Sequence, residues 1–528
     1  MATNKWTGNA AAVAQVDTFT PASVTIGNTF TLSCSTKSIT FTATAATVAN
    51  VTAGLTSLVN ASTIPEFQEV VAADATTALT LTSRTAGVVF TITSSAAQGA
   101  GSGGMTLTRA ATTTSSGPND WNVAGNWTAG VVPQGLCIAP TLGTPGLVAA
   151  GTLADATPFY YKVSATNANG ESLPSPEVTK TTASPSLEIT LAWTAIPGAT
   201  GYLVYRSLVS GSYVGSHLLA IITSGATVTY ADTGAASLVA GSPLGGSTAV
   251  GDDVVFDQSS VDCSYSLDQH TLTLASFTQT AAYTGRIGLP DYNGAYYQYR
   301  PLYLQIGMPT ITIGAGPGTG SGRTKLDAGA VQTAVTVFLT GAASDAGFRP
   351  FMFKGTHASN TMTVYSGQVG IATDVGAVST IATLTTGLVN GSGDASVLCG
   401  VGVTMGTINQ NSGAVVLNAG ATTVNAFAGL TVIYGAGAFT TMTITSGTVF
   451  YESSGTLTTL VIAGGGAIDF TRDQRARTVS SCVISAGAKV IDSFSTVTWS
   501  AGVKFRNCNN LNTTVDLGTH LTLTPSSF

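Results

Sequence analysis

Ser446-Gly447-Thr448-Val449-Phe450-Tyr451 is a clear copy of a short element, S/A-G-x-V, that recurs with drift through the second half of the chain. Its copies occupy residues 366–369, 412–415, 428–431, 446–449, 486–490 and 501–503. From Gly413 onward the glycines at these turns stand 15 to 23 residues apart, and a short alternating strand follows each of them. A period of about 20 residues with one turn glycine per strand is typical of a β-solenoid, in which stacked coils share one core. The alternative is a large β-sandwich with accidental spacing.

The composition favours β structure throughout. Only 8% of the 528 residues are charged, against about 25% in an ordinary soluble protein, and 61 are glycine. Helix surfaces depend on Glu, Lys and Arg, whereas the abundant Thr and Val suit a pleated sheet. We therefore expect a mainly β fold.

Charge and hydropathy exclude two classes of partner. The net charge is −6 and no Lys/Arg cluster of consequence is present, so binding to nucleic acid is not expected, because it needs a basic face. The mean hydropathy is +0.33, yet no apolar run reaches the roughly 18 to 20 residues of a membrane helix. The first six residues, MATNKW, lack the features of a secretory signal. Six scattered cysteines predict buried thiols in a protein folded in a reducing cytoplasm.

Residues 1–110 predict a small α+β unit. Strands are expected at 24–26, 30–32, 39–43, 79–82 and 89–92. Between them Thr47 is a predicted N-cap for a helix with Val48, Val51, Leu55 and Leu58 among the residues on one face. The order G-x-x-F-T-L, I-T-F-T-A-T, helix, L-T-L-T resembles a small module of tailed-phage structural proteins, which implies an attachment or assembly role. Residues 99–118, rich in Gly, Ser and Thr, predict a linker.

Two separated stretches resemble one signature. Residues 126–133 and 251–256 together give N-W-x-x-G-x-V-P…G-D-x-V-x-F, which resembles the opening of many bacterial and phage β-helix surface proteins. The resemblance implies a domain inserted between the two halves, where the ends of the host chain lie close together. Residues 111–136 would then be linker and the start of a β-helix cap, with Trp121 and Trp127 closing the open end of the solenoid.

The segment 137–248 predicts a β-sandwich of its own. The motifs at 160–167, 189–193, 197–206 and 230–234 resemble those of Ig/fibronectin type III-like domains, and the alternation places Trp193 and Tyr202 in the core. Here the Trp strand follows the Tyr-x-V-x-A strand, the reverse of the family order, which implies a circularly permuted sandwich. Residues 249–528 would form the β-solenoid stalk.

Two groups of residues are candidates for an interface or a glycan contact. The densest charge cluster contains Asp469, Arg472, Asp473, Arg475 and Arg477, and it suits an acidic sugar, a neighbouring subunit or a solvated loop with internal ion pairs. Tyrosines stack on sugars and are enriched at protein interfaces. Six of them stand within 21 residues: Tyr283, Tyr292, Tyr296, Tyr297, Tyr299 and Tyr303.

Catalytic candidates are few. Asp252, Asp253 and Asp257 resemble paired carboxylates for glycan hydrolysis, although a G-D-D sequence at the start of a strand also suits turn formation. The four histidines are isolated from one another, so we expect no metal site, no catalytic triad and no cofactor.

These observations predict a non-enzymatic structural protein of a phage virion, either a head decoration or fibre protein or part of a tail fibre. It would be made in the host cytoplasm, lie at the virion surface and contact capsid or tail proteins and host surface glycans. The exposed apolar strands of a solenoid and the tyrosines predict a homotrimer. The alternatives are a self-assembling bacterial surface fibre at the extracellular surface and a tailspike glycan depolymerase.

Overall fold

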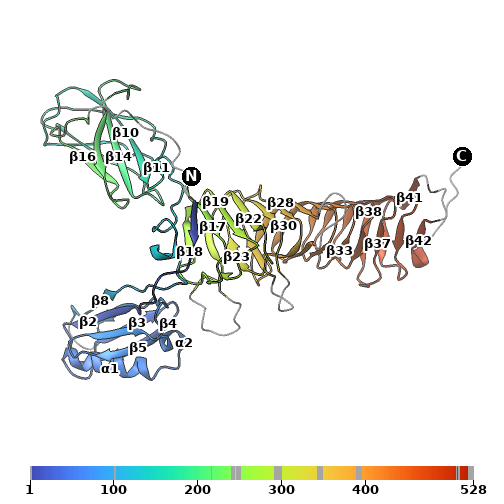
Figure 1. Ribbon diagram of the computed structural model, residues 1–528, viewed down its shortest axis with the longest axis horizontal. Helices are drawn as coiled ribbons and strands as arrows, with labels where there is room; N and C mark the ends of the chain where they lie inside the picture. Colours follow the sequence, from blue (N-terminus) through green and yellow to red (C-terminus); the bar gives the residue numbers. More distant parts are fainter. Residues whose placement is uncertain are drawn as a thin grey trace.

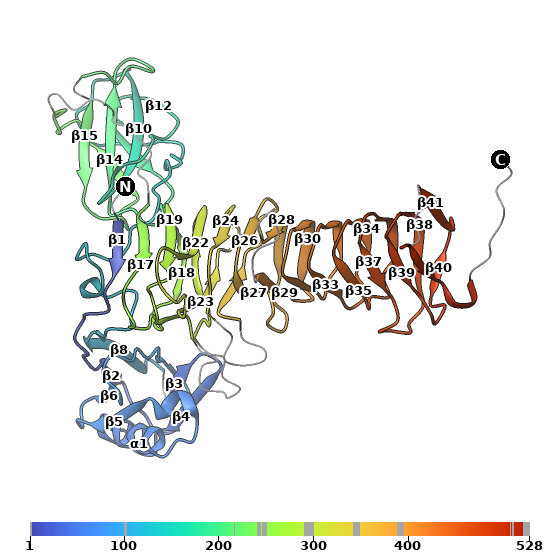
Figure 2. The same ribbon diagram turned by 45° about the vertical axis from the view of Figure 1, so that its right-hand side comes forward.

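The computed structural model describes residues 3–99, 103–215, 217–239, 244, 251–289, 300–341, 349–387, 395–506, 508 and 512–520. The chain is mainly β, as predicted, and its two largest sheets are long and parallel. Figures 1 and 2 show an elongated body with two smaller units beside the end that carries the N-terminus. This body is compatible with the predicted β-solenoid.

From β17 onward the chain alternates between the two long sheets, except that β20 and β21 both join the second sheet and β40 and β41 both join the first. The first sheet contains β1 (Thr3–Trp6), β17 (Asp253–Phe256), β19 (Ser276–Thr280), β22 (Thr310–Ala315), β24 (Ala334–Val337), β26 (Thr361–Val364), β28 (Ser379–Thr386), β30 (Val403–Gln410), β32 (Ala421–Ala426), β34 (Phe439–Ile444), β36 (Leu457–Ile462), β38 (Arg477–Ser485), β40 (Val497–Trp499) and β41 (Val503–Arg506). The second contains β18 (Asp268–Thr273), β20 (Arg286–Ile287), β21 (Leu304–Gly307), β23 (Arg323–Asp327), β25 (Phe351–Lys354), β27 (Gly367–Ile371), β29 (Ala395–Cys399), β31 (Ala414–Leu417), β33 (Leu430–Ile433), β35 (Thr448–Tyr451), β37 (Ala467–Asp469), β39 (Lys489–Ile491) and β42 (Thr514–Asp516).

In-register pairing stacks like residues above one another. In the second long sheet Val397 pairs with Val415, Val415 with Thr431, Thr431 with Val449 and Val449 with Ile468. These side chains point inward and are fully buried. The apolar members belong to one continuous core that runs from Trp6 to Leu517. The fourth position of the S/A-G-x-V repeat therefore corresponds to an inward, buried residue of these strands.

Thr431 is the polar exception in this column, and it has a specific partner. Its hydroxyl donates to the side-chain oxygen of Gln410, which is also fully buried. The amide of Gln410 donates to the carbonyls of Gly413 and Leu430 at 3.0 and 2.9 Å. A buried polar pair is tolerated when its groups are bonded in this way.

Aromatic residues fill the end of the core nearest the N-terminus. Trp6, Trp121, Trp127 and Phe256 stack edge-to-face or in parallel, with ring centroids 4.7 to 6.4 Å apart. The predicted position of Trp121 and Trp127 at this end is confirmed. Trp6 was not foreseen there. Strand β1 pairs in parallel with β17, so residues 3–6 belong to the first long sheet and not to the N-terminal unit.

The N-terminal unit pairs a helix with two antiparallel sheets. One sheet contains β5 (Val70–Asp74), β6 (Leu79–Ser83), β2 (Val16–Ala22) and β8 (Thr106–Thr113), and the other contains β4 (Lys37–Thr42), β3 (Thr29–Cys34) and β7 (Thr93–Ala97). Helix α1 (Val48–Asn60) begins at the predicted cap, where Thr47 Oγ1 accepts from the Asn50 amide, and α2 (Pro65–Gln68) adds one turn. Leu58, expected on the buried face, is 40% exposed.

Three predictions for this unit were wrong. Residues 24–26 form no strand, because the chain turns between β2 and β3, where the Asn28 amide donates to the Thr25 carbonyl at 3.2 Å. Residues 89–92 form no strand either, although Phe90 and Ile92 are buried, and the strand begins at Thr93. Part of the predicted linker, 99–118, is strand β8, which pairs with β2 along its length. The reason lies in a distant partner: Arg109 Nε donates to the buried carboxylate of Asp17 at 2.7 Å.

The segment between the two signature halves has its own core. β11 (Gly170–Glu171), β10 (Pro158–Asn167), β14 (Gly201–Ser207), β15 (Leu218–Ile222) and β12 (Val178–Thr181) form one antiparallel sheet, and β16 (Thr229–Asp232), β13 (Glu188–Ala192) and β9 (Gly146–Val148) form another. One cluster of buried side chains joins the two sheets. Within it Trp193 packs edge-on against Tyr202 at 5.4 Å, as predicted.

The chain leaves and rejoins the body at a single point. The amide of Asp252 donates to the carbonyl of Gln134 at 2.9 Å, and the amide of Gln134 donates to the carboxylate of Asp252 at 2.8 Å. Asn169, within the segment, donates to the same carboxylate at 2.8 Å. The predicted closeness of the two signature halves is therefore confirmed.

The turn glycines allow adjacent coils to approach closely, which a substitution tests. Gly429 has a φ of +85°, and a Cβ there would lie 2.3 Å from the carbonyl oxygen of Gly413 in the preceding coil. We expect Gly429→Ala to destabilise the body by at least about 2 kcal/mol, from left-handed backbone strain and displacement of that carbonyl. Calorimetry should show a lower Tm. The control is Gly465→Ala, where a Cβ meets no atom within 4 Å and φ is not left-handed; equal Tm values for the two variants would contradict this account.

Candidate interaction surface

The predicted charge cluster lies on one connection of the body. Asp469 ends β37, Arg472, Asp473 and Arg475 stand in the connection that follows, and Arg477 begins β38. The structure therefore brings all five residues together, as their closeness in the sequence predicts. Their environments differ sharply, so they do not act as one site.

Arg477 is the structural centre of this connection. Its side chain is fully buried, and its guanidinium donates to the carbonyls of Tyr451, Asp473 and Arg475, the last at 2.6 and 2.9 Å. Burial lowers the pKa of Arg477, and the nearby carboxylate of Asp473 opposes that shift. Arg477 thus shapes the connection from inside and presents no charge to a ligand.

Arg475 ties the same connection to earlier coils. Its Nε donates to the carboxylate of Asp473 at 2.8 Å, and its Nη2 donates to the carbonyl of Glu452 at 2.6 Å. Its Nη1 lies 3.5 Å from the carbonyl of Gly435, one coil further away. The hydrogen bond from Arg475 lowers the pKa of Asp473 below its ordinary value. These contacts favour the interpretation of this pair as internal bonding between coils.

Arg472 is the member of the cluster directed at a surface. Its guanidinium carbon lies 3.3 Å from the centre of the Phe450 ring, on the outer side of β35. Its Nη1 is 3.8 Å from the carboxylate of Glu452, a weak pair with the arginine side chain 49% exposed. Arg472 and Phe450 together offer a cation and an aromatic ring to a partner.

The tyrosine group divides in two. Tyr292, Tyr296, Tyr297 and Tyr299 lie outside the described residues. Tyr283 and Tyr303 are buried, so the expected contact with a partner is wrong for these two. Tyr283 donates to the carbonyl of Val261 at 2.9 Å within the body, and Lys354 Nζ lies 3.7 Å from the centre of the Tyr303 ring.

The three candidate carboxylates are used locally. Asp252 joins the two ends of the segment described above. Asp253 accepts from Ser276 at 2.5 Å, and Asp257 accepts from Thr280 at 2.9 Å and pairs with Lys5 at 3.3 Å. Each carboxylate therefore bonds a neighbouring strand or segment, as expected for turn and edge positions.

The sequence did not reveal one buried ion pair between the N-terminal unit and the body. Arg300 donates to both carboxylate oxygens of Glu69 at 2.9 and 2.8 Å and to the carbonyl of Val89 at 2.8 Å. Its guanidinium also lies 5.3 Å from the ring centre of Tyr265. The side chains are only 10% and 4% exposed. No local pattern links two residues this far apart in the chain.

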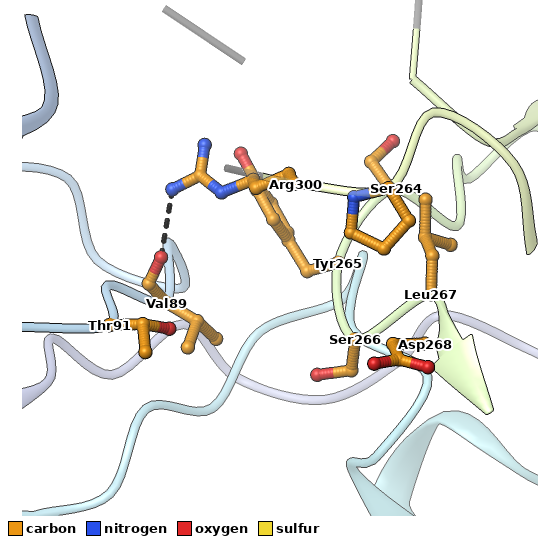
Figure 3. Close-up of a pocket in the computed structure, with 9 residues that line it drawn as sticks. Val89, Thr91, Ser264, Tyr265, Ser266, Leu267, Asp268 and Arg300 are labelled. Atoms are coloured by element: carbon orange, nitrogen blue, oxygen red, sulfur yellow. Dashed lines mark hydrogen bonds between the residues drawn. The ribbon is translucent and has the colours of Figure 1, made fainter. Parts of the chain in front are cut away.

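Figure 3 shows the pocket beside this ion pair, with Arg300 alongside Tyr265 and bonded to Val89. The pocket encloses about 240 Å³ and is also lined by Thr91, Ser264, Ser266, Leu267, Asp268 and Pro301. Ligand sites commonly span roughly 300 to 1,000 Å³. The small volume and the engaged guanidinium indicate a joint between two units.

Within the described ranges no three His, Cys, Asp or Glu side chains are grouped to hold a metal ion. Cys34, Cys137, Cys263, Cys399 and Cys482 are buried, as predicted, and burial raises the pKa of Cys399 to about 12. No helix in the described part of the chain has the length and apolar character needed to cross a membrane.

Comparison of the chain with known protein families, with curated proteins and with solved structures finds no match.

The role assigned to Arg477 predicts local opening when the guanidinium is removed. Arg477→Met leaves buried carbonyls without donors, and tryptic cleavage after Arg475 should become at least about tenfold faster, which corresponds to about 1.4 kcal/mol of lost local stability. Arg472→Met is the control, because that guanidinium lies on an outer ring. Equal cleavage rates after Arg475 in the two variants would show that Arg477 does not hold the connection.

The Arg300–Glu69 ion pair joins the N-terminal unit to the body, so we expect its removal to loosen that contact without unfolding the unit. Arg300→Met removes the guanidinium that bonds both oxygens of the buried Glu69 carboxylate, and removing one partner of a buried pair costs about 3–5 kcal/mol. Hydrogen exchange should rise at residues 264–267 while the amides of α1 stay protected. Arg84→Met is the control, because Arg84 donates to the carbonyls of Gln68 and Val70 within the same unit. Unchanged exchange at 264–267 in Arg300→Met would refute the joint.

Proposed function

We propose that the chain is a non-enzymatic structural component of a phage virion, a head decoration or fibre protein or part of a tail fibre. In this proposal the two long sheets form a β-solenoid stalk, and residues 137–248 are an inserted, permuted fibronectin type III-like sandwich displayed at its end. The N-terminal unit attaches the stalk to capsid or tail proteins. The protein is a homotrimer at the virion surface, where the displayed parts meet host surface glycans.

One observation carries the proposal: a single hydrophobic core runs the length of the elongated body, and both side units lie at the same end (Figures 1 and 2). Stacked coils sharing one core resist bending, because every coil is packed against both neighbours. A stiff body with separate units at one end suits attachment and display.

The joints support a mechanical role. Asp252 bonds both to Gln134 and to Asn169, which fixes the root of the inserted segment. The Arg300–Glu69 pair fixes the N-terminal unit in the same region of the body. The three aspartates considered for glycan hydrolysis, Asp252, Asp253 and Asp257, each bond a neighbouring strand or segment.

One observation favours the alternative of a self-assembling bacterial surface fibre. Among the described strands, β40 and β42 close the two sheets and pair on one side only. Open strand edges bind further strands, and end-to-end growth would make a filament.

Sedimentation velocity and negative-stain imaging of the full chain separate these functions. We expect a trimeric mass and rods of uniform length with extra density at one end. Open-ended filaments of variable length would support the bacterial fibre instead. A globular monomer would overturn both.

A further inference from the structure

The second long sheet carries one apolar column on its outer face. Its register pairs Leu398 with Val416, Val416 with Val432 and Val432 with Phe450. These residues alternate with the inward residues of the same strands and do not belong to the body core. The column therefore lies on the surface of four consecutive strands, β29 to β35.

The column is partly exposed and carries no charge. Leu398, Val416 and Phe450 are partly exposed, whereas Val432 between them is buried, with 7% exposure. The next position towards the C-terminus is Asp469, which pairs with Phe450. Contiguous apolar surface of this kind marks an interface in a soluble protein.

The outer face of the first long sheet has a different character. From β24 to β34 its corresponding column contains hydroxyl and amide side chains, and Val461 and Val483 follow on β36 and β38. The polar members are Thr336, Thr363, Thr385, Asn409, Asn425 and Thr443. Neutral polar ladders of this kind satisfy one another, as the 2.9 Å bond from Asn425 to Asn409 shows. Interfaces between proteins favour aromatic and apolar anchors. The apolar column is thus the better candidate for a contact.

We propose that three copies of the chain pack this column, Leu398, Val416, Val432 and Phe450, around a threefold axis parallel to the body. The inference rests on the proposed function and names the face that makes the trimer. Each coil then contributes one side chain per copy to a layer at the axis, much as single core positions do in a coiled coil.

A second copy fits the column for a geometric reason. Neighbouring strands are about 4.8 Å apart, so the column repeats at that spacing along the body. Another copy in parallel presents the same repeat, and every layer can be filled without slippage. In the flanking outer column Ser396, Ala414 and Thr448 are small, and Leu430 adds a further apolar side chain to the same face.

Charge complementarity at the end of the column also favours a second copy of the chain as the partner. Phe450 is covered by Arg472, which is about half exposed and only weakly paired within its own chain. Asp469 lies in the same column one strand further along. Around a threefold axis the Arg472 of one copy meets the Asp469 of the next, and the like charges of the three Asp469 side chains are neutralised.

The test places a charge in the column and, as a matched control, on the other sheet. Val416→Asp puts three carboxylates at the axis, whereas Thr423→Asp puts one on the outer face of β32, the next strand along the chain. Circular dichroism checks that both variants fold. We expect sedimentation velocity to give a monomer for Val416→Asp and a trimer for the wild type and Thr423→Asp.

The outcomes separate this inference from the proposed function. A monomeric wild type overturns both. If the wild type is a trimer and Val416→Asp keeps the trimeric mass, the apolar column is not the interface, but the proposed fibre function is unaffected. The same conclusion holds if only Thr423→Asp loses the trimer.

Cysteine cross-linking tests the same face without a destabilising charge. Val416→Cys places one thiol per copy at the axis, within disulfide range of its symmetry mates. We expect mild oxidation to give a covalent dimer of chains on a non-reducing gel for Val416→Cys and none for Thr423→Cys. The reverse pattern, or no cross-link in either variant of a trimeric protein, overturns the proposed face.

Discussion

In-register parallel stacking is the constraint on which the rest of the body depends. Each residue of a strand lies directly above the residue at the same position in the next coil, as the pairing of Val415 with Thr431 and Thr431 with Val449 shows. The same charge repeated at one position of successive coils would place like charges directly opposite each other, which destabilises a sheet. The low content of charged residues, 8%, fits this constraint. Uncharged residues such as Thr, Asn and Val therefore occupy many of the outward positions of the strands.

Charged side chains have a specific role where the stacking is interrupted. The cluster from Arg472 to Arg477 occupies a connection, and its guanidinium groups bond carbonyls of earlier coils. Arg300 and Asp252 lie at the junctions with the two side units. In each place a charged side chain joins segments that backbone pairing does not join.

The sequence predicts what repeats and what is local. Turn glycines such as Gly429, the N-cap Thr47 and the packing of Trp193 on Tyr202 depend on neighbours in sequence or on alternation, and all are confirmed. Strand β8 and the Arg300–Glu69 pair depend on partners far away in the chain, and neither was foreseen. The outward apolar column is an intermediate case. Its residues are visible in the repeat, but which of two alternating residues faces out is decided by the register.

The two ends of the body are not equivalent, which bears on how copies associate. At the N-terminal end the free edge of β1 is already covered: Thr7 donates to the Asn126 carbonyl at 2.8 Å, and Thr128 donates to the Lys5 carbonyl at 2.9 Å. Trp127 bridges Trp6 there in antiparallel fashion. An edge whose donors and acceptors are bonded cannot accept a strand from another chain. End-to-end growth would require this covering segment to leave and the aromatic cluster to open. Lateral association through an outer face disturbs neither, and this asymmetry favours a closed oligomer over a filament.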